Sequence, residues 1–239
     1  MQAMINEIPT SASNRAGFNG AFPFHVVARG TAAALEVVYV LDQDPRVVES
    51  LSRTLAERGI LVLGFTSSAD YLSYTRTDAA ACLVLDADLA DIHLFQLQSQ
   101  FGSKTNPPIV ITGRPYDVIA AVQAMKAGAV EFLTKPIDGD AMVGAVRTAF
   151  DHDRKQRRKR AELATLQLRF SRLTPREREV FTLIAGGFLN KQAAAHLGIS
   201  DITVQIHRGQ VMRKMEAESF AELVRMAVKL RIPCAVRSL

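Results

Sequence analysis

The chain has 239 residues and a formal net charge of +5 at pH 7, with 48% hydrophobic and 22% charged residues. This length fits one or two domains, and the composition supplies a packed core for each, which excludes a chain disordered throughout. No run of 18 residues lacks charge, so no transmembrane helix is expected. The start of the chain lacks a secretory-signal pattern, and with only two cysteines, Cys82 and Cys234, we expect a location in the reducing cytoplasm.

The net charge is divided unevenly along the chain. Residues 36–150 hold 9 Lys and Arg against 14 Asp and Glu, a net charge of −5, whereas residues 151–239 hold 18 against 9, a net charge of +9. An acidic part joined to a strongly basic part predicts two domains with different partners, and nucleic acid is the candidate partner of the basic part. From charge alone, a basic surface that is merely solvated is an equal alternative.

Residues 1–35 are rich in glycine, alanine, serine and asparagine without a sustained period, which predicts a flexible lead. From residue 37 onward, short apolar runs alternate with longer amphipathic stretches. Near-continuous apolar strands that alternate with helices are typical of a five-stranded parallel α/β sheet, doubly wound and covered on both faces. The predicted strands are 37–41, 61–65, 81–85, 108–112 and 131–134, and the predicted helices are 45–58, 68–74, 92–101, 118–127 and one that begins near 138.

Polar side chains lie at the carboxyl ends of four of these predicted strands, which is where functional groups collect in parallel sheets. They are Asp42, Asp86, Thr112 and Lys135. A carboxylate can accept a phosphoryl group if a cation offsets its charge and other polar groups hold the phosphoryl oxygens. We predict Asp86 as the acceptor and Asp42 as a ligand of Mg²⁺, with Lys135 and Thr112 on the phosphoryl group.

Residues 36–150 resemble the receiver domain of two-component response regulators, which has a flavodoxin-like fold. The resemblance is carried by Leu41-Asp42, Leu85-Asp86, Ile111-Thr112-Gly113, residues 124–129, Phe132 and Lys135-Pro136. It implies that a sensor histidine kinase phosphorylates Asp86. It also implies that Phe132 is a switch aromatic that turns inward when Thr112 moves.

The sequence departs from the receiver pattern at the first pair of acids, which here is Asp42-Gln43. The loss of one unit charge about 4 Å from a divalent ion removes up to about 8 kcal/mol of Coulomb energy at an effective dielectric constant near 20. Asp44 is a candidate replacement ligand, but it precedes Pro45 and also fits a helix N-cap. A degenerate receiver that acts without aspartyl phosphorylation is therefore the main alternative.

An enzyme is the more remote alternative. Asp42-Gln43-Asp44 also resembles the D-x-D nucleophile motif of haloacid-dehalogenase-type phosphatases, with Thr112 and Lys135 as the next two motifs. That family needs a late acidic pair on a strand of its own. Asp138-Gly139-Asp140 follows Lys135 too closely for this, so we expect a protein that is not an enzyme.

Residues 151–172 are predicted to be a helical basic linker. Arg154–Arg160 holds six bases in seven residues, which fits a solvated face, additional phosphate contacts or docking on the acidic domain. Leu163, Leu166 and Phe170 form one apolar stripe. The stripe fits either pairing between two linkers or packing on the domain that follows.

Four helices are predicted in residues 173–239. Capping boxes at Thr174–Glu177 and Ser219–Glu222 begin the first and the last of them. Asn190 and Ser200 are candidate N-caps of the second and third helices, the third spanning about residues 201–216. A short helix, a tight glycine turn and a longer helix match the helix-turn-helix layout.

This part of the chain resembles the LuxR-type DNA-binding domain, and residues 211–228 are closest to the FixJ branch of the NarL/FixJ response regulators. The resemblance implies that the third helix enters the major groove and that Gln205 and Ile206 stand where base edges are read, whereas a base contact is lost at Gly209. It is carried by Leu173–Val180, Asn190-Lys191, Leu197–Ser200, Thr203-Val204, His207 and Lys214-Met215.

Apolar residues on the third helix have two interpretations. Val204 and Ile206 would touch thymine methyl groups if exposed, with core packing as the alternative. For Ile202, Met212 and Met215 we expect core packing. Contacts to phosphate position a protein without specifying a sequence, and they are predicted for Lys191, Thr203, His207, Arg208 and Lys214.

Together these patterns predict a cytoplasmic transcription regulator of the FixJ type that binds a two-fold DNA site as a homodimer. Pairing is expected through helix 118–127 and strand 131–134, by the resemblance. The unmodified receiver would mask the DNA-binding domain until a signal at Asp86 releases it, and RNA polymerase is a further candidate partner.

Overall fold

The computed structural model describes residues 25–26, 36–76, 78–89 and 106–233. The chain divides into two compact units, residues 1–153 and 154–239. Within the described part, no helix is both long enough and apolar enough to cross a membrane.

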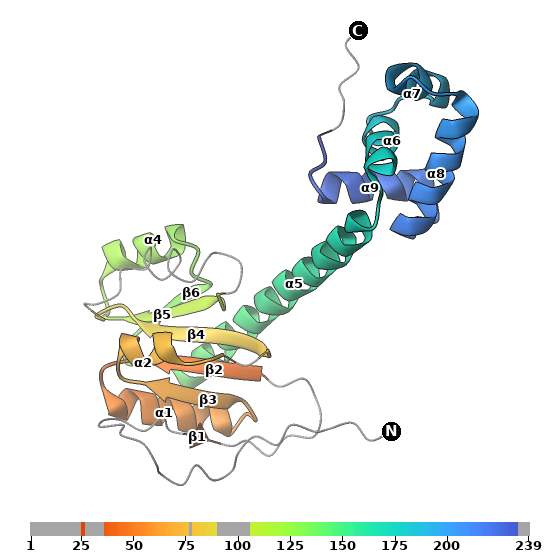
Figure 1. Ribbon diagram of the computed structural model, residues 1–239. Coiled ribbons are helices and arrows are strands. Elements are labelled where there is room, and N and C mark those ends of the chain that lie inside the picture. The colour runs from red at the N-terminus through yellow and green to blue at the C-terminus, as the bar shows by residue number, and fades with distance from the viewer. Residues whose placement is uncertain (1–24, 27–35, 77, 90–105, 234–239) are drawn as a thin grey trace, which may run out of the picture. The chain divides into compact units, whose positions relative to one another are not determined.

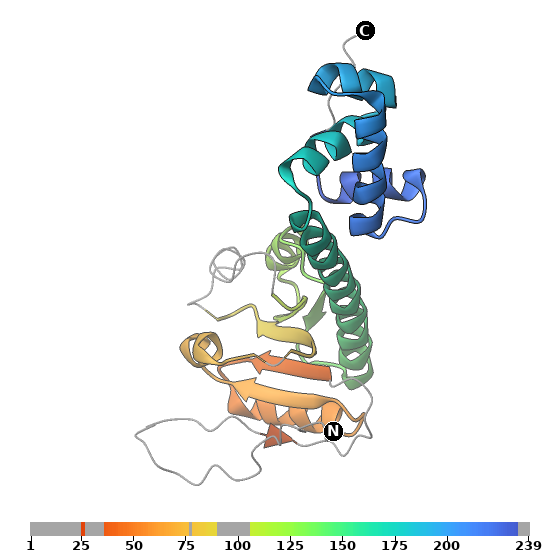
Figure 2. The same cartoon turned by 45° about the vertical axis from the view of Figure 1, so that its right-hand side comes forward.

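The first unit is built on one sheet with the strand order β1-β3-β2-β4-β5-β6 (Figures 1 and 2). The five predicted strands are all present and parallel, which confirms the predicted receiver fold. Most of their residues are buried because helices cover both faces, and this explains why the strands are apolar runs rather than alternating ones. The strands are β2 (Glu36–Leu41), β3 (Leu61–Phe65), β4 (Ala80–Asp86), β5 (Ile109–Gly113) and β6 (Glu131–Thr134).

A sixth strand, β1 (His25–Val26), falls within the predicted flexible lead and corrects that prediction locally. It pairs antiparallel with β3, with His25 opposite Leu63. Without it, the outer edge of β3 would present unpaired backbone groups, which is a physical reason for an added strand. Two residues carry no detectable period, so the sequence pattern gave no sign of it.

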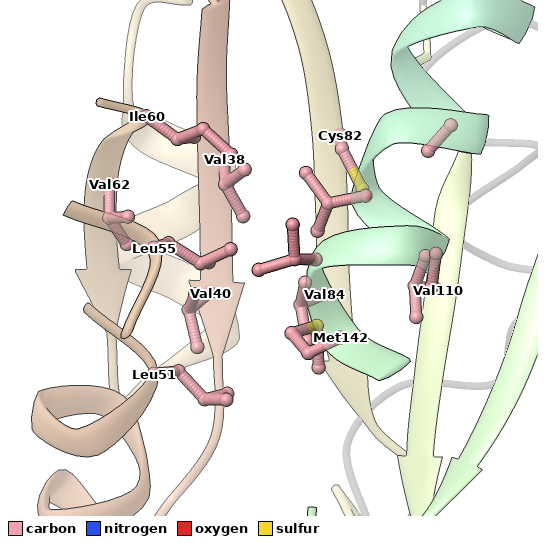
Figure 3. Close-up of a cluster of buried hydrophobic side chains, with 14 of the residues drawn as sticks. Val38, Val40, Leu51, Leu55, Ile60, Val62, Cys82, Val84, Val110 and Met142 are labelled. Atoms are coloured by element: carbon pink, nitrogen blue, oxygen red, sulfur yellow. The ribbon is translucent and has the colours of Figure 1, made fainter. Parts of the chain in front are cut away.

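Helices α1 (Pro45–Ala56) and α5 (Gly139–Ser171) pack on one face of the sheet, and α2 (Ser68–Ser73) and α4 (Val118–Lys126) pack on the other. The predicted helix 92–101 lies outside the described residues. Burial raises the pKa of the Cys82 thiol, which belongs to the core as a free cysteine. Figure 3 shows the core on the face of the sheet that α1 and α5 cover. Its labelled residues are Val38, Val40, Leu51, Leu55, Ile60, Val62, Cys82, Val84, Val110 and Met142.

Helix α5 is one continuous helix of 33 residues and contains the predicted basic linker. Toward the first unit, the buried carboxylate of Asp153 accepts a hydrogen bond from the backbone N–H of Ala81 at 3.1 Å. Toward the second unit, Leu166 is 5% exposed within the core and Phe170 packs against it. The apolar stripe therefore packs on the helical domain, and Leu163 at its start is the more exposed member.

Between residues 172 and 233, the described part of the second unit after α5, the chain forms four further helices, as predicted. The Thr174 capping box is present, Ser200 and Ser219 cap the third and fourth helices, and Gly198 ends the second with a φ of 66°. One predicted cap is wrong: Asn190 is the first residue of its helix, and the Gln192 side chain accepts from the backbone N–H of Leu189 instead. The helices are α6 (Pro175–Ala185), α7 (Asn190–Leu197), α8 (Asp201–Met215) and α9 (Phe220–Lys229).

Candidate functional site

Two carboxylates and one ammonium meet at the carboxyl end of the sheet. Lys135 Nζ lies 2.8 Å from Asp42 Oδ2 and 3.1 Å from Asp86 Oδ2. Asp42 and Asp86 are 3% and 7% exposed, so their charges are held largely out of water. A single ammonium that bridges two buried carboxylates offsets the repulsion that would otherwise separate them.

Backbone pairing between the strands brings these residues to the same edge of the sheet. In the β4–β5 register Asp86 is the partner of Thr112, and the N–H of Ala87 donates to the Thr112 carbonyl at 2.7 Å. The N–H of Lys135 donates to the Gly113 carbonyl at 2.8 Å, which brings the lysine to the same edge. Thr112 is 1% exposed and is the register partner of Asp86.

Burial alone would lower the pKa of Lys135, because desolvation disfavours the charged amine. The hydrogen bonds to Asp42 and Asp86 outweigh this effect and hold the pKa of Lys135 above its usual value. The lysine therefore stays protonated at neutral pH and keeps its charge available to the two acids.

Phe132, the predicted switch aromatic, is partly buried against the second core of the sheet. Its ring lies over Gly113: a Cβ added at that glycine would come within 2.5 Å of the ring Cζ. A side chain at position 113 would thus displace the ring. Glycine next to Thr112 leaves room for the aromatic ring at the edge of the site.

The Asp44 side chain is held by Arg46, in contrast to the predicted role of a metal ligand. Its side chain caps α1 by accepting from the N–H of Arg46 at 2.9 Å, and Arg46 Nε and Nη2 each lie 3.2 Å from the same carboxylate. These hydrogen bonds lower the pKa of Asp44. Its backbone N–H contributes instead, because it donates to Asp42 Oδ1 at 2.8 Å. The N-cap alternative describes its side chain, and the prediction of Asp44 as a ligand is corrected.

A second ion pair at the same edge was missed by the sequence interpretation. Arg114 binds Asp88 in a bidentate manner, with Nε 2.8 Å from Oδ2 and Nη2 3.0 Å from Oδ1, and this lowers the pKa of Asp88. The Asp88 backbone N–H reaches Asp86 Oδ1 at 3.3 Å. Asp86 and Thr112 are register partners, so the residues two positions after each lie on neighbouring loops. An acid at one of these positions and a base at the other would identify the pair only once the register between β4 and β5 is known.

The second unit presents its own candidate site on α8. Val204, Val211 and Met215 are fully buried and attach the helix to the core, while Gln205 and Ile206 are exposed on its outer side. The base contact suggested for Val204 is therefore corrected to core packing. The prediction for Ile202 is wrong in the opposite sense, because this side chain is 71% exposed.

Two of the predicted phosphate contacts are held by other side chains. Lys214 Nζ lies 2.6 Å from Oε2 of the buried Glu177, so its ammonium points into the domain, and its assignment to phosphate is corrected. Arg208 donates to Asn190 Oδ1 at 3.1 Å and stacks over the Phe220 ring at 4.7 Å.

The other predicted phosphate contacts are more accessible. Lys191 is exposed at the start of α7. Thr203 shares a 2.7 Å hydrogen bond with the Ser200 hydroxyl within the α8 cap, and His207 is half-buried one turn further on. Lys191 is thus the most accessible cation among the predicted phosphate contacts.

The sequence matches two known families, one within each of the two units. Residues 38–147 match the "Response regulator receiver domain", and residues 171–227 match "Bacterial regulatory proteins, luxR family". Nodulation protein W of Bradyrhizobium diazoefficiens is 40% identical over 204 residues, which cover 84% of this chain and 89% of that protein. This chain belongs to the NarL/FixJ-type response regulators.

Two further relatives extend the match of this NarL/FixJ-type regulator over both domains. The transcriptional regulatory protein FixJ of Azorhizobium caulinodans is 38% identical over 193 residues, which cover 80% of this chain and 91% of that protein. The low-resolution structure of the response regulator StyR has a TM-score of 0.68 and 36% sequence identity, and covers 82% of this chain and 100% of that chain. The regulator therefore couples a receiver to a LuxR-type DNA-binding domain.

Receiver domains typically bind Mg²⁺ at the phosphorylation site. In this NarL/FixJ-type regulator the fit is poor: no group of three His, Cys, Asp or Glu side chains able to hold a metal ion is found among the residues that the structure describes. Gln43 is an exposed amide where receivers carry an acid, Asp44 is bound to Arg46, and Lys135 occupies the space between the two remaining carboxylates. The donor set lacks one negative charge for a divalent cation.

Proposed function

We propose that Asp86 is the phosphoacceptor of this regulator and that its modification controls pairing and DNA binding by the LuxR-type domain. The supporting observation is the cluster of Asp86, Asp42, Lys135 and Thr112 at one edge of the sheet. A carboxylate oxygen of Asp86 attacks phosphorus, the bond to the donor breaks, and the donor leaves with the electron pair. Lys135 then pairs with the phosphoryl oxygens, and Thr112 hydrogen-bonds them.

The donor expected for a response regulator is a sensor histidine kinase. The direct experiment uses the full chain, Mg²⁺ and acetyl phosphate as a small phosphodonor, with intact mass and oligomer size measured together. We expect an adduct of one phosphoryl group on the wild type and none on Asp86→Ala, together with a shift of the wild type toward dimer. Asp88→Ala is the matched control, because it removes a nearby carboxylate that does not accept the group.

A second candidate function is a degenerate receiver that works without aspartyl phosphorylation. The observation that favours it is the missing acid at Gln43 together with the ion pairs that Lys135 makes with both buried carboxylates. Dimer formation and DNA binding without any adduct would establish this second candidate. A phosphatase is disfavoured, because its family needs a late acidic pair on a strand of its own, whereas Asp138 caps α5 by accepting from the N–H of Ala141 and Asp140 lies in the first turn of that helix. We accordingly propose no enzymatic activity.

Magnesium affinity gives a separate prediction. Gln43→Asp adds a unit charge beside the metal position and is expected to tighten Mg²⁺ binding at least tenfold, a small part of the full Coulomb energy because desolvation opposes it. Calorimetric titration of each variant with Mg²⁺ measures the change in affinity directly. Gln43→Glu adds the same charge on a longer side chain and is the matched control. Its Mg²⁺ affinity is expected to increase less than that of Gln43→Asp. Equal affinity of the wild type and Gln43→Asp would contradict the argument.

For the homodimer, we propose the α4 face named by the family resemblance. Val118, Ile119, Val122 and Met125 are 68%, 73%, 46% and 49% exposed and recur at helical spacing. Four large apolar side chains on one short helix form a patch of the kind that marks a protein contact. The neighbouring strand β6 supplies the rest of the surface. A two-fold DNA site follows from such a symmetric pair.

A further inference from the structure

The outer face of α8 carries an apolar stripe that the fold does not use. Val204, Val211 and Met215 are fully buried and define the inner face of the helix. At 100° per residue, Ile202 and Ile206 lie on the opposite side, and they are 71% and 60% exposed. Gly209 continues the same stripe one turn further on. None of these three positions contributes to the core of the domain.

Packing within the domain does not require a glycine at position 209. A Cβ added there would meet nothing within 4 Å, and its φ is not in the left-handed region, so an alanine would fit. A glycine inside a helix is less stable than alanine, so the fold gains nothing from its absent side chain. An absent side chain on an outer face instead lets another molecule approach the backbone closely.

The occupant of this face is DNA, because α8 is the groove-entering helix of the LuxR-type domain and its N-terminal residues meet base edges. The surrounding charge agrees: Lys191 and Arg213 are exposed on the same domain, which carries the basic excess of the chain. Apolar side chains cannot hydrogen-bond base edges. In the major groove they have one specific partner, the C5-methyl group of thymine.

We propose that Ile202 and Ile206 read the methyl groups of two thymines in the major groove and that Gly209 permits the close approach this reading needs. The inference rests on DNA binding by the LuxR-type domain and adds the base chemistry it selects. Residues four apart on a helix are separated by about 6 Å along the axis, which spans about two base-pair steps of about 3.4 Å. The two methyl groups are therefore expected within one half-site. Because 5-methylcytosine carries its methyl at the same position, it is expected to substitute in part.

The test begins with selection of bound sequences by the full chain from a random-sequence duplex library. In the selected duplex, single thymines are then replaced by deoxyuridine, which removes the methyl group and leaves the Watson–Crick edge unchanged. Replacement at two positions of each half-site is expected to weaken binding about fourfold each, the value of one buried methyl group. Ile202→Ala is expected to abolish the effect at one position, and Ile206→Ala at the other.

Two controls separate methyl reading from other causes. Val228→Ala removes apolar surface from α9, where Val228 is 66% exposed, and is expected to keep the full deoxyuridine effect. Gly209→Ala is expected to weaken binding several-fold while leaving the unfolding temperature unchanged or higher. Circular dichroism of each variant confirms that the fold is retained.

The inference is overturned if deoxyuridine has no effect at any thymine of the selected site, or if Ile202→Ala keeps the full discrimination. Failure of DNA binding itself is distinguishable, because it appears as retention of no duplex at all. That result, or a selection without preferred thymines, also overturns the reading of methyl groups. Sequence-independent binding to every duplex does the same.

Discussion

Lys135→Met is expected to cost the receiver about 2–4 kcal/mol of unfolding free energy at pH 7 and to abolish acceptance of a phosphoryl group. The substitution keeps the alkyl chain and removes only the charge that Asp42 and Asp86 share at 2.8 and 3.1 Å. Removal of one partner of a buried ion pair typically costs about 3–5 kcal/mol, and the 26% exposure of the lysine side chain reduces this. Urea unfolding without Mg²⁺ measures the loss.

The pH dependence gives this prediction a second readout. The pKa of Lys135 is raised in the fold, so its contribution is complete below the unfolded value of 10.5 and is lost as the pH rises through the higher folded value. Lys135→Met lacks this ammonium, so its stability deficit relative to the wild type is expected to shrink as the pH rises through the folded pKa of Lys135.

Arg58→Met is the matched control for Lys135→Met. It removes a cation from the ion pair with Asp140, whose 2.8 Å separation equals that in the pocket but whose side chains are 47% and 85% exposed. Exposed pairs contribute about 0–1 kcal/mol. Equal losses from Lys135→Met and Arg58→Met at pH 7 would show that the buried acids do not depend on the lysine.

Much of the receiver follows from sequence because its strands are continuous apolar runs, and because parallel strands place their carboxyl ends together. Asp42, Asp86 and Lys135 were thus predicted to meet before any distance was known. The pair of Asp88 and Arg114 was not, because it depends on the register between two strands. Register is set by long-range packing rather than by the residues of either strand alone.

In helix α8, by contrast, the sequence alone does not separate buried from exposed residues. Val204, Val211 and Met215 lie on the buried face of this helix. Ile202 and Ile206 are just as apolar but are exposed on the opposite face, so hydrophobicity alone does not show which face packs on the core. Lys214 was assigned to phosphate because of its charge. Its partner Glu177 lies on another helix, so only the tertiary fold pairs them.

DNA affinity is expected to fall on the order of 10³-fold between 50 and 200 mM salt, because a dimer that makes six or more phosphate contacts releases that many counterions. Lys191→Ala should lower the slope of log affinity against log salt by about 2, one phosphate contact for each protomer of the dimer, with little change in stability, because its ammonium is exposed. A flat salt response would contradict binding in the groove.

Lys214→Met is expected to behave in the opposite way, which makes it the matched comparison for Lys191→Ala. It leaves Glu177, 5% exposed, without its charged partner, so the DNA-binding domain should lose about 1–3 kcal/mol while the salt slope stays the same. Burial alone would raise the pKa of Glu177, but the bonds from Lys214 and Thr174 hold it below the usual 4.5.

The contribution of Glu177 is therefore present above pH 4.5 and lost as the pH falls through its folded pKa, and the variant should lose part of this dependence. Acid titration of the unfolding free energy, for the wild type and for Lys214→Met, measures that difference. If Lys214→Met instead lowered the salt slope of the dimer by about two and left stability and its pH dependence unchanged, the lysine would contact the DNA backbone and not Glu177.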